Sequence, residues 1–310
     1  MQKLKIIFFG TPEFAVPVLE TLTTAHEVVA VVTAPDKPAG RGMQLQFSAV
    51  KNAALRLNLP VLQPEKLKNE DFVNELKAFG ADLFVVVAFR MLPEIVWNMP
   101  PLGSINLHAS LLPQYRGAAP INWAIINGEK ETGLTTFKLQ HEIDTGNIIF
   151  QEKIAIAPDM NVGELYQTMM GVGKELMLKT VNALAENKVV FLPQNNFDTL
   201  QHAPKLFKET GKINWQQNVA AIHNLVRGLS PYPAAHTFYN GKNLKIFQTK
   251  VEMANPQEPV GVIVSDNKTF LKVATVDGYL LLLELQLEGK KRMPIEEFLR
   301  GNSVENVVLG

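Results

Sequence analysis

Two polar side chains, Asn106 and His108, stand two positions apart in the stretch Gly103–Pro120. On a β-strand this spacing directs both side chains to the same face. An imidazole can exchange a proton near neutral pH, and a carboxamide N–H can donate to an oxyanion. The pair therefore suits a reaction that passes through a tetrahedral, oxyanion-bearing intermediate.

A carboxylate that could complete such a site is Asp144, in the turn Ile143-Asp144-Thr145-Gly146. It could orient His108 and favour its protonated form. Together Asn106, His108 and Asp144 suit attack of an amine on a formyl carbon, because the amine must lose a proton and the leaving nitrogen must gain one. The alternative is structural: an isolated strand histidine is often only hydrogen-bonded, and Asp-Thr-Gly is a common turn.

Other chemistries have weaker signals. The first loop, Gly10–Phe14, lacks the second and third glycines of a dinucleotide fingerprint, and Pro12 removes a backbone donor. No second histidine lies at metal-ligand spacing from His141, so we expect no metal. The polar segment Pro35–Gln44 reads as an exposed loop that offers Lys37 and Arg41 to phosphates, with a simple surface loop as the alternative.

Short apolar, β-branched runs alternate with helical patterns through the first half of the chain. This alternation predicts an α/β fold with a mostly parallel, Rossmann-like, doubly wound sheet. Strands are expected at Leu4–Phe9, Glu27–Thr33, Leu59–Leu62 and Asp82–Ala88, and helices at Ala49–Leu57, Phe72–Phe79 and Val219–Arg227. Asn161 and Glu164 form a capping-box pattern at the start of a further helix.

A change in the sequence pattern near residue 190 predicts two domains. Periodicity is lost over residues 191–207, which we expect to link a catalytic domain (1–190) to a C-terminal domain (208–310). Short strands around Asn240-Gly241, Asp266-Asn267 and Asp277-Gly278 indicate hairpins and a small, OB-like β-barrel.

Composition sets the remaining expectations. The 310 residues include no cysteine, which excludes disulfides and thiolate chemistry and fits a reducing, cytoplasmic location. Net charge is zero, although the part from His202 onward carries thirteen Lys and Arg against ten Asp and Glu. No apolar run approaches the roughly 20 residues of a membrane span. A monomer is the default expectation.

Two long motifs resemble the formyltransferase family. Asn106–Ile121 is similar to the folate-site segment of that family, and Ile143–Gly146 to its second catalytic motif. Within the family, the chain resembles members that formylate methionyl initiator tRNA. That resemblance extends over Phe9–Phe14, Pro38–Gly42, Ala203–Leu206, Arg227–Ala234 and Leu285–Met293.

The resemblance implies a catalytic trio of Asn106, His108 and Asp144, hereafter the candidate trio. It implies 10-formyltetrahydrofolate as the formyl donor and the amine of methionyl initiator tRNA as the acceptor, with tRNA contacting both domains. The implied folate-binding residues are Ser110, Leu111, Leu112, Pro113, Phe89, Met91 and Leu92. The implied tRNA or substrate contacts are Arg41, Lys37 and Phe14.

Some positions depart from the family pattern. Met43 and Gln44 replace the usual loop lysines, and Arg90 replaces a glycine at a strand exit, which puts the backbone there in question. Two other functions stay open: a small acceptor such as a sugar amine or water, and a non-catalytic domain that binds nucleic acid. The segment Gln286–Met293 argues against the first, and the intact candidate trio against the second.

Overall fold

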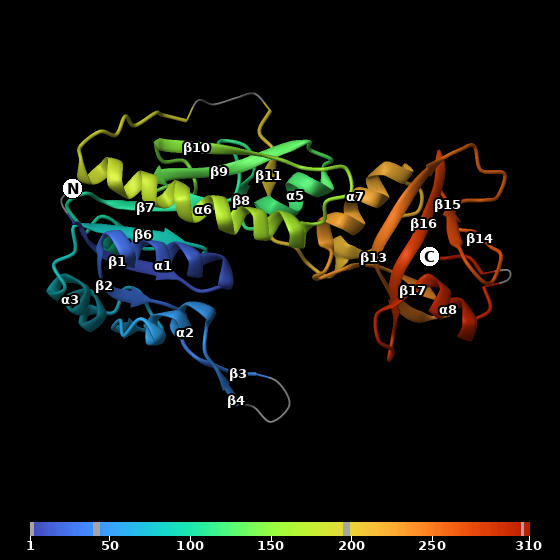
Figure 1. Cartoon of the computed structure of the whole chain (residues 1–310), viewed down its shortest axis with the longest axis horizontal. Helices are drawn as coiled ribbons and strands as arrows, with labels where there is room; N and C mark the ends of the chain where they lie inside the picture. Colours follow the sequence, from blue (N-terminus) through green and yellow to red (C-terminus); the bar gives the residue numbers. More distant parts are fainter. Residues whose placement is uncertain (1–2, 40–43, 195–198, 305–306) are drawn as a thin grey trace. The chain divides into compact units, whose positions relative to one another are not determined.

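The computed structural model describes residues 3–39, 44–194, 199–304 and 307–310, which fall into two compact units (Figure 1). The N-terminal unit comprises Met1–Gly117, Thr132–Ile154 and Tyr166–His202. The C-terminal unit comprises Ala118–Glu131, Ala155–Leu165 and Ala203–Gly310. The chain therefore contributes two short internal segments to the C-terminal unit before its C-terminal third joins them.

A seven-stranded sheet forms the centre of the N-terminal unit, in the order β10-β9-β7-β6-β1-β2-β5 (Figure 1). The strands are β1 (Lys5–Gly10), β2 (Glu27–Val32), β5 (Val61–Leu62), β6 (Leu83–Val87), β7 (Ser104–His108), β9 (Glu131–Lys138) and β10 (Ile148–Ala155). Pairing is parallel from β7 through β6, β1 and β2 to β5, whereas β9 runs antiparallel to β7. The predicted mostly parallel, doubly wound sheet is confirmed.

Helices bury the apolar faces of this sheet. The helical elements of this part of the chain are η1 (Glu13–Ala15), α1 (Val16–Ala25), α2 (Ala49–Arg56), α3 (Glu70–Ala78), α4 (Glu94–Trp97) and α6 (Val162–Ala185). Phe72 and Leu76 of α3 pack in one core cluster with Ile7 and Phe9 of β1. Because successive strand residues alternate between faces, the fully buried Ile6 and Phe8 serve the opposite face.

The predicted capping box at the start of α6 is present. The Asn161 side chain accepts from the Glu164 N–H at 3.0 Å, and the Glu164 carboxylate accepts from the Asn161 N–H at 2.9 Å. Two otherwise unpaired backbone donors are thereby satisfied. Among the described residues no helix is both long and apolar enough to cross a bilayer.

Arg90, which replaces a glycine of the family pattern, does not strain the backbone at the exit of β6. The left-handed residue is Ala88, with φ of 47°, and Arg90 is not among the residues with positive φ. The Arg90 guanidinium instead donates to the carbonyl oxygens of Glu65, at 2.8 Å, and Pro64. The backbone at position 90 therefore has no need of a glycine, and the arginine side chain ties the strand exit to a neighbouring loop.

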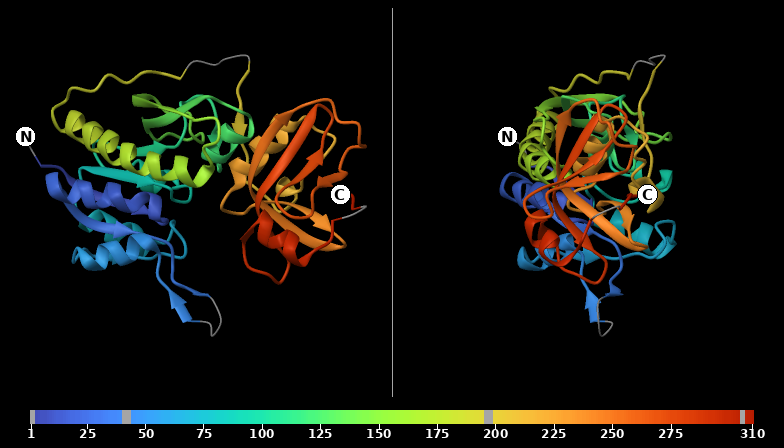
Figure 2. Two further views of the ribbon diagram at one scale, coloured as in Figure 1. Left: turned by 45° about the vertical axis from the view of Figure 1, so that its right-hand side comes forward. Right: turned by 90° about the vertical axis from the view of Figure 1, so that its right-hand side faces the viewer.

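An antiparallel sheet dominates the C-terminal unit (Figure 2). Its strands are β12 (Ala235–Tyr239), β13 (Lys242–Met253), β14 (Ile263–Ser265), β15 (Leu271–Ala274), β16 (Gly278–Leu287) and β17 (Met293–Pro294). Asn240 and Gly241 both have positive φ and join β12 to β13, as the turn signal predicted. The C-terminal β domain is thus confirmed, with the strand order β12-β13-β16-β15-β14 and β17 beside β16.

Helix α7 (Val219–Leu229) connects this sheet to the internal segments. Its Asn218 cap accepts from Ala221 N–H at 2.7 Å. Helix α5 (Pro120–Ile126) packs on α7 so closely that a Cβ at Gly228 would lie 2.6 Å from Ile126. The remaining elements are β3 (Lys37–Ala39), β4 (Gln44–Gln46), β8 (Arg116–Gly117), β11 (His202–Ala203), η2 (Glu209–Gly211) and α8 (Ile295–Gly301).

Candidate active site

The C-terminal end of β7 holds the first two members of the candidate trio. Asn106 and His108 share one face of the strand, and both are paired opposite β9. His108 is 7% exposed, and its Nε2 lies 2.9 Å from the Tyr115 carbonyl oxygen. A carbonyl only accepts, so the hydrogen of the neutral ring lies on Nε2, and Nδ1 carries the lone pair.

Asp144 faces that second ring nitrogen. Its Oδ2 lies 3.8 Å from His108 Nδ1 and also accepts from the Gly117 N–H at 3.0 Å. Asp144 has φ of 54°, in the left-handed region that aspartate tolerates better than most residues. The structure therefore brings His108 and Asp144 together, 36 residues apart in sequence.

The Asp144 loop, residues 139–147 between β9 and β10, is held by a residue that sequence reasoning missed. Gln194 Nε2 donates to the carbonyl oxygens of Asp144, at 2.9 Å, and Gly146, at 2.8 Å. Its Oε1 accepts from Arg116 Nη2 at 2.6 Å. Gln194 lies within the predicted 191–207 linker, where a polar residue carries no signal of such a role.

We expect Gln194→Ala to lower kcat about tenfold, because Asp144 and Gly146 lose two restraints on the loop that carries the carboxylate. The KM values should change little. Steady-state kinetics of the purified variant provide the check, with Gln217→Ala as a matched exposed control. Unchanged kcat would show that the loop is held without Gln194.

The predicted folate segment begins directly after β7. The Ser110 side chain is fully buried and its Oγ donates to the Gln114 carbonyl at 2.6 Å. Leu112 is 3% exposed, and its N–H donates to Thr135 Oγ1 at 3.1 Å. The Ser110 hydroxyl and the Leu112 N–H stabilise the segment itself, whereas Leu111 is partly exposed. Folate contact by these residues and Pro113 stays a prediction.

The second predicted folate segment follows β6, and its side chains differ in how far they are exposed to solvent. Met91 is 72% exposed, and Leu92 is 6% exposed and belongs to the core of the sheet. The Phe89 ring packs edge-on against Phe9, with centroids 5.7 Å apart. Leu92 and Phe89 therefore help fold the strand exit, and contact of all three with a pterin stays a prediction.

The three predicted substrate contacts, Phe14, Lys37 and Arg41, differ in their surroundings. Phe14 is 5% exposed and packs edge-on against Tyr166, whose hydroxyl accepts from the Phe14 N–H at 2.9 Å. Burial raises the pKa of Tyr166. Lys37 is exposed on β3, and Arg41 lies outside the described residues.

The base of the β3–β4 hairpin is anchored by a polar cluster. Asp36 pairs with Lys51, and Gln63 donates to Asp36 Oδ1 and to the Ala34 carbonyl, both at 2.8 Å. The Lys51 ammonium also lies 3.9 Å from the Phe47 ring centroid. The hydrogen bonds from Lys51 and Gln63 lower the pKa of Asp36. These contacts fix the segment that leads into β3.

Within the described parts of the chain, no group of three or more metal-ligating side chains is close enough to hold an ion. The candidate trio offers a proton acceptor in His108, a carboxylate in Asp144 and an amide in Asn106. The Asn106 carboxamide has no hydrogen-bond partner among the described residues, so its N–H donors are available to a ligand.

Comparisons with known proteins agree with this fold. The family model "Formyl transferase" matches residues 3–181, and "Formyl transferase, C-terminal domain" matches residues 205–303. The chain belongs to the formyl transferase family. It is 52% identical over 309 residues to the methionyl-tRNA formyltransferase of Bacteroides thetaiotaomicron, covering 97% of this chain and 96% of that protein.

A second relative and two solved structures complete the comparison. The methionyl-tRNA formyltransferase of Parabacteroides distasonis is 54% identical over 311 residues, covering 97% and 96% of the two chains. The sugar 3N-formyl transferase WlaRD matches with a TM-score of 0.68 at 21% identity, covering 94% of this chain and all of the other. HypX from Aquifex aeolicus with tetrahydrofolic acid gives 0.65 at 18%, covering 96% and 47%. At these identities the two structures agree in fold alone.

Proposed function

We propose that this chain transfers the formyl group of 10-formyltetrahydrofolate to the amino group of methionyl initiator tRNA. The observation that carries the proposal is the match, over 97% of the chain and through both units, to proteins named methionyl-tRNA formyltransferase. The acceptor places the reaction in the cytoplasm, with the protein acting as a monomer. Residues 1–190 serve as the catalytic domain, 191–207 as a linker, and 208–310 as a tRNA-binding domain.

In this reaction His108 handles the proton. Its Nε2–H is held by the Tyr115 carbonyl, so Nδ1 accepts the proton that the attacking amine must lose. The Asp144 carboxylate, 3.8 Å away, stabilises the imidazolium that forms. The same Nδ1–H can then protonate the leaving nitrogen of the folate.

Asn106 acts on the oxyanion. Attack on the formyl carbon converts its carbonyl oxygen into an anion, and the amide N–H of Asn106 donates to it. Removing a single donor of this kind costs roughly 2.7–4 kcal/mol of transition-state stabilisation in other enzymes. Phe89, Met91, Leu92 and residues 110–113 would hold the folate, and Phe14 would contact the methionyl side chain.

The test is transfer of labelled formyl from 10-formyltetrahydrofolate to methionyl initiator tRNA, with methionyl elongator tRNA as the control. Initiator-selective labelling is the expected result. If neither tRNA is labelled while folate is bound and slowly deformylated, the acceptor is a small amine or water. The candidate trio would then keep its role and the tRNA assignment would be wrong.

Arg41 offers a separate test of the acceptor side. We expect Arg41→Ala to raise the KM for tRNA about tenfold, because one phosphate or base-edge contact is lost, while folate affinity stays unchanged. Lys37→Ala on the neighbouring strand tests whether the effect depends on position or only on charge. An equal loss of folate affinity would assign the loop to the donor instead.

A further inference from the structure

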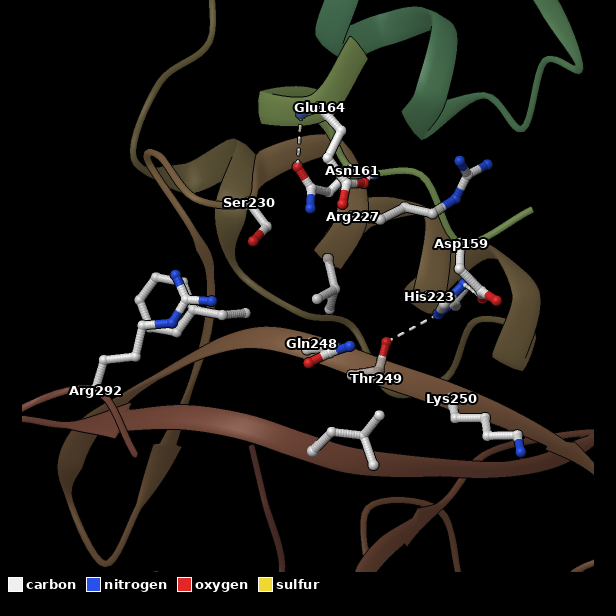
Figure 3. Close-up of a pocket in the computed structure, with 13 residues that line it drawn as sticks. Asp159, Asn161, Glu164, His223, Arg227, Ser230, Gln248, Thr249, Lys250 and Arg292 are labelled. Atoms are coloured by element: carbon white, nitrogen blue, oxygen red, sulfur yellow. Dashed lines mark hydrogen bonds and ion pairs between the residues drawn. The ribbon is translucent and has the colours of Figure 1, made fainter. Parts of the chain in front are cut away.

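The C-terminal unit contains a pocket of roughly 330 Å³ that the proposed chemistry does not use (Figure 3). It lies between the start of α6, helix α7, and strands β13 and β16. Val226 of α7 and Leu283 of β16 supply its apolar lining. Its size falls at the small end of the range of ligand-binding pockets.

One wall of the pocket carries a guanidinium that lies over an aromatic ring. The Arg292 guanidinium lies 4.3 Å from the centroid of the Phe247 ring, and it pairs with Glu284. Phe247 is 9% exposed, but the Arg292 side chain is 40% exposed. The planar guanidinium therefore lies over the ring, and its partial exposure leaves it accessible to a planar ligand.

Amide and hydroxyl groups line the space beside this wall. Asn161, Ser230 and Gln248 extend toward the same open volume (Figure 3). Asn161 Oδ1 is already used in the helix cap, which leaves its Nδ2 donors for a ligand. The Gln248 side chain is exposed and has no partner among the residues that the structure describes. Donors and acceptors are thus both present.

The charges around the pocket do not favour a simple anion. Three cations line the pocket, Arg227, Lys250 and Arg292, together with the carboxylates of Asp159 and Glu164. Arg292 is paired with Glu284, and Asp159 lies 3.5 Å from His223 Nε2. Burial and the charge of Arg227 lower the pKa of His223, which favours the neutral imidazole. A pocket with balanced charge, a flat platform and amide groups suits a neutral, planar ligand with a hydrogen-bonding edge.

We propose that this pocket binds one unstacked nucleobase, with Arg292 stacking on its face and Asn161 and Gln248 bonding to its edge. Single-stranded bases in RNA are recognised by stacking on aromatic or guanidinium planes and by hydrogen bonds to their edges. In the proposed function the base belongs to the tRNA acceptor, so this inference rests on that function. A free mononucleotide offers the same chemistry, and the test separates the two sources.

The first arm measures the affinity of labelled initiator tRNA for the full-length chain at several salt concentrations. Arg292→Lys keeps the charge but loses the plane, and it should weaken binding about tenfold without changing the salt slope, as expected for a lost base stack. Gln248→Ala should weaken binding severalfold. Arg300 is an exposed residue of α8 outside the pocket. Arg300→Gln should therefore change the affinity for tRNA only by the small amount expected from the loss of one distant charge. Thermal unfolding of each variant verifies that it is folded.

The second arm titrates the wild-type chain and Arg292→Lys with AMP, CMP, GMP and UMP at millimolar concentration, followed by calorimetry. Arg292-dependent binding of any of them supports the pocket even if formyl transfer to tRNA fails, and assigns it to a free nucleotide. One contrary outcome is that the wild type transfers formyl to tRNA while Arg292→Lys binds tRNA and the mononucleotides as tightly as the wild type does. That result overturns the nucleobase site and leaves the proposed function standing. Failure of tRNA and all four nucleotides to bind the wild type overturns it as well.

Discussion

His108→Ala should lower kcat for formyl transfer at least about a hundredfold, the scale of a lost acid–base group. Of the other members of the candidate trio, Asp144 is held by the Gly117 N–H and Asn106 cannot accept a proton, so we expect neither to replace the ring. Affinity for the folate donor should be largely retained. Single-turnover transfer with saturating donor and acceptor isolates the chemical step from binding.

The matched control for this variant is His141→Ala, which removes an exposed imidazole three residues before Asp144. It should leave kcat within about twofold of the wild type. His108→Gln tests whether hydrogen bonding alone suffices, since glutamine can still donate to the Tyr115 carbonyl but cannot exchange a proton at neutral pH. Near-normal turnover in His108→Ala would remove the histidine from the mechanism.

Gly146→Ala should displace the whole Asp144 loop. A Cβ at this position would lie 1.7 Å from the Lys138 carbonyl oxygen, so the backbone itself must move. Overpacking of this kind costs about 1–3 kcal/mol of folding free energy. Because Asp144 is two residues away and Gly146 O accepts from Gln194, the carboxylate should lose its alignment with His108. We expect kcat to fall at least about a hundredfold.

Gly171→Ala is the control for Gly146→Ala, because the same chemical change should here stabilise the fold rather than destabilise it. Gly171 lies in α6, and a Cβ there meets nothing within 4 Å. The substitution should stabilise the helix by about 0.5–1 kcal/mol and leave kcat unchanged. Thermal unfolding and kinetics of the two variants give the comparison. Normal kcat in Gly146→Ala would show that the alignment of Asp144 does not limit the reaction.

Local sequence patterns predicted the strands and helices well, because the formation of these elements depends on residues that are near neighbours in sequence. The apolar runs at Lys5–Gly10 and Leu83–Val87 form buried strands, and the capping box at Asn161 is present with both hydrogen bonds. Segment ends coincide with the prediction or differ from it by one or two residues: α3, for example, starts at Glu70 rather than Phe72. Its Asn69 cap accepts from Phe72 N–H and begins the helix earlier than the apolar spacing indicated.

The candidate site could be predicted only in part. Asn106 and His108 lie on one strand, so their shared face followed from a two-residue period. Phe14, expected to contact a substrate, is instead 5% exposed against Tyr166, a residue 152 positions later in the chain. Its contact with methionine stays a prediction.

The sequence by itself determined which residues form strands and helices, which two polar side chains share a strand face, and which family the chain resembles. Tertiary structure alone decided that Gln194 holds the Asp144 loop and that α5 packs with α7. The physical reason is that periodicity and capping act between near neighbours. Contacts across 50 or more residues depend on where the folded chain returns, which no local pattern encodes.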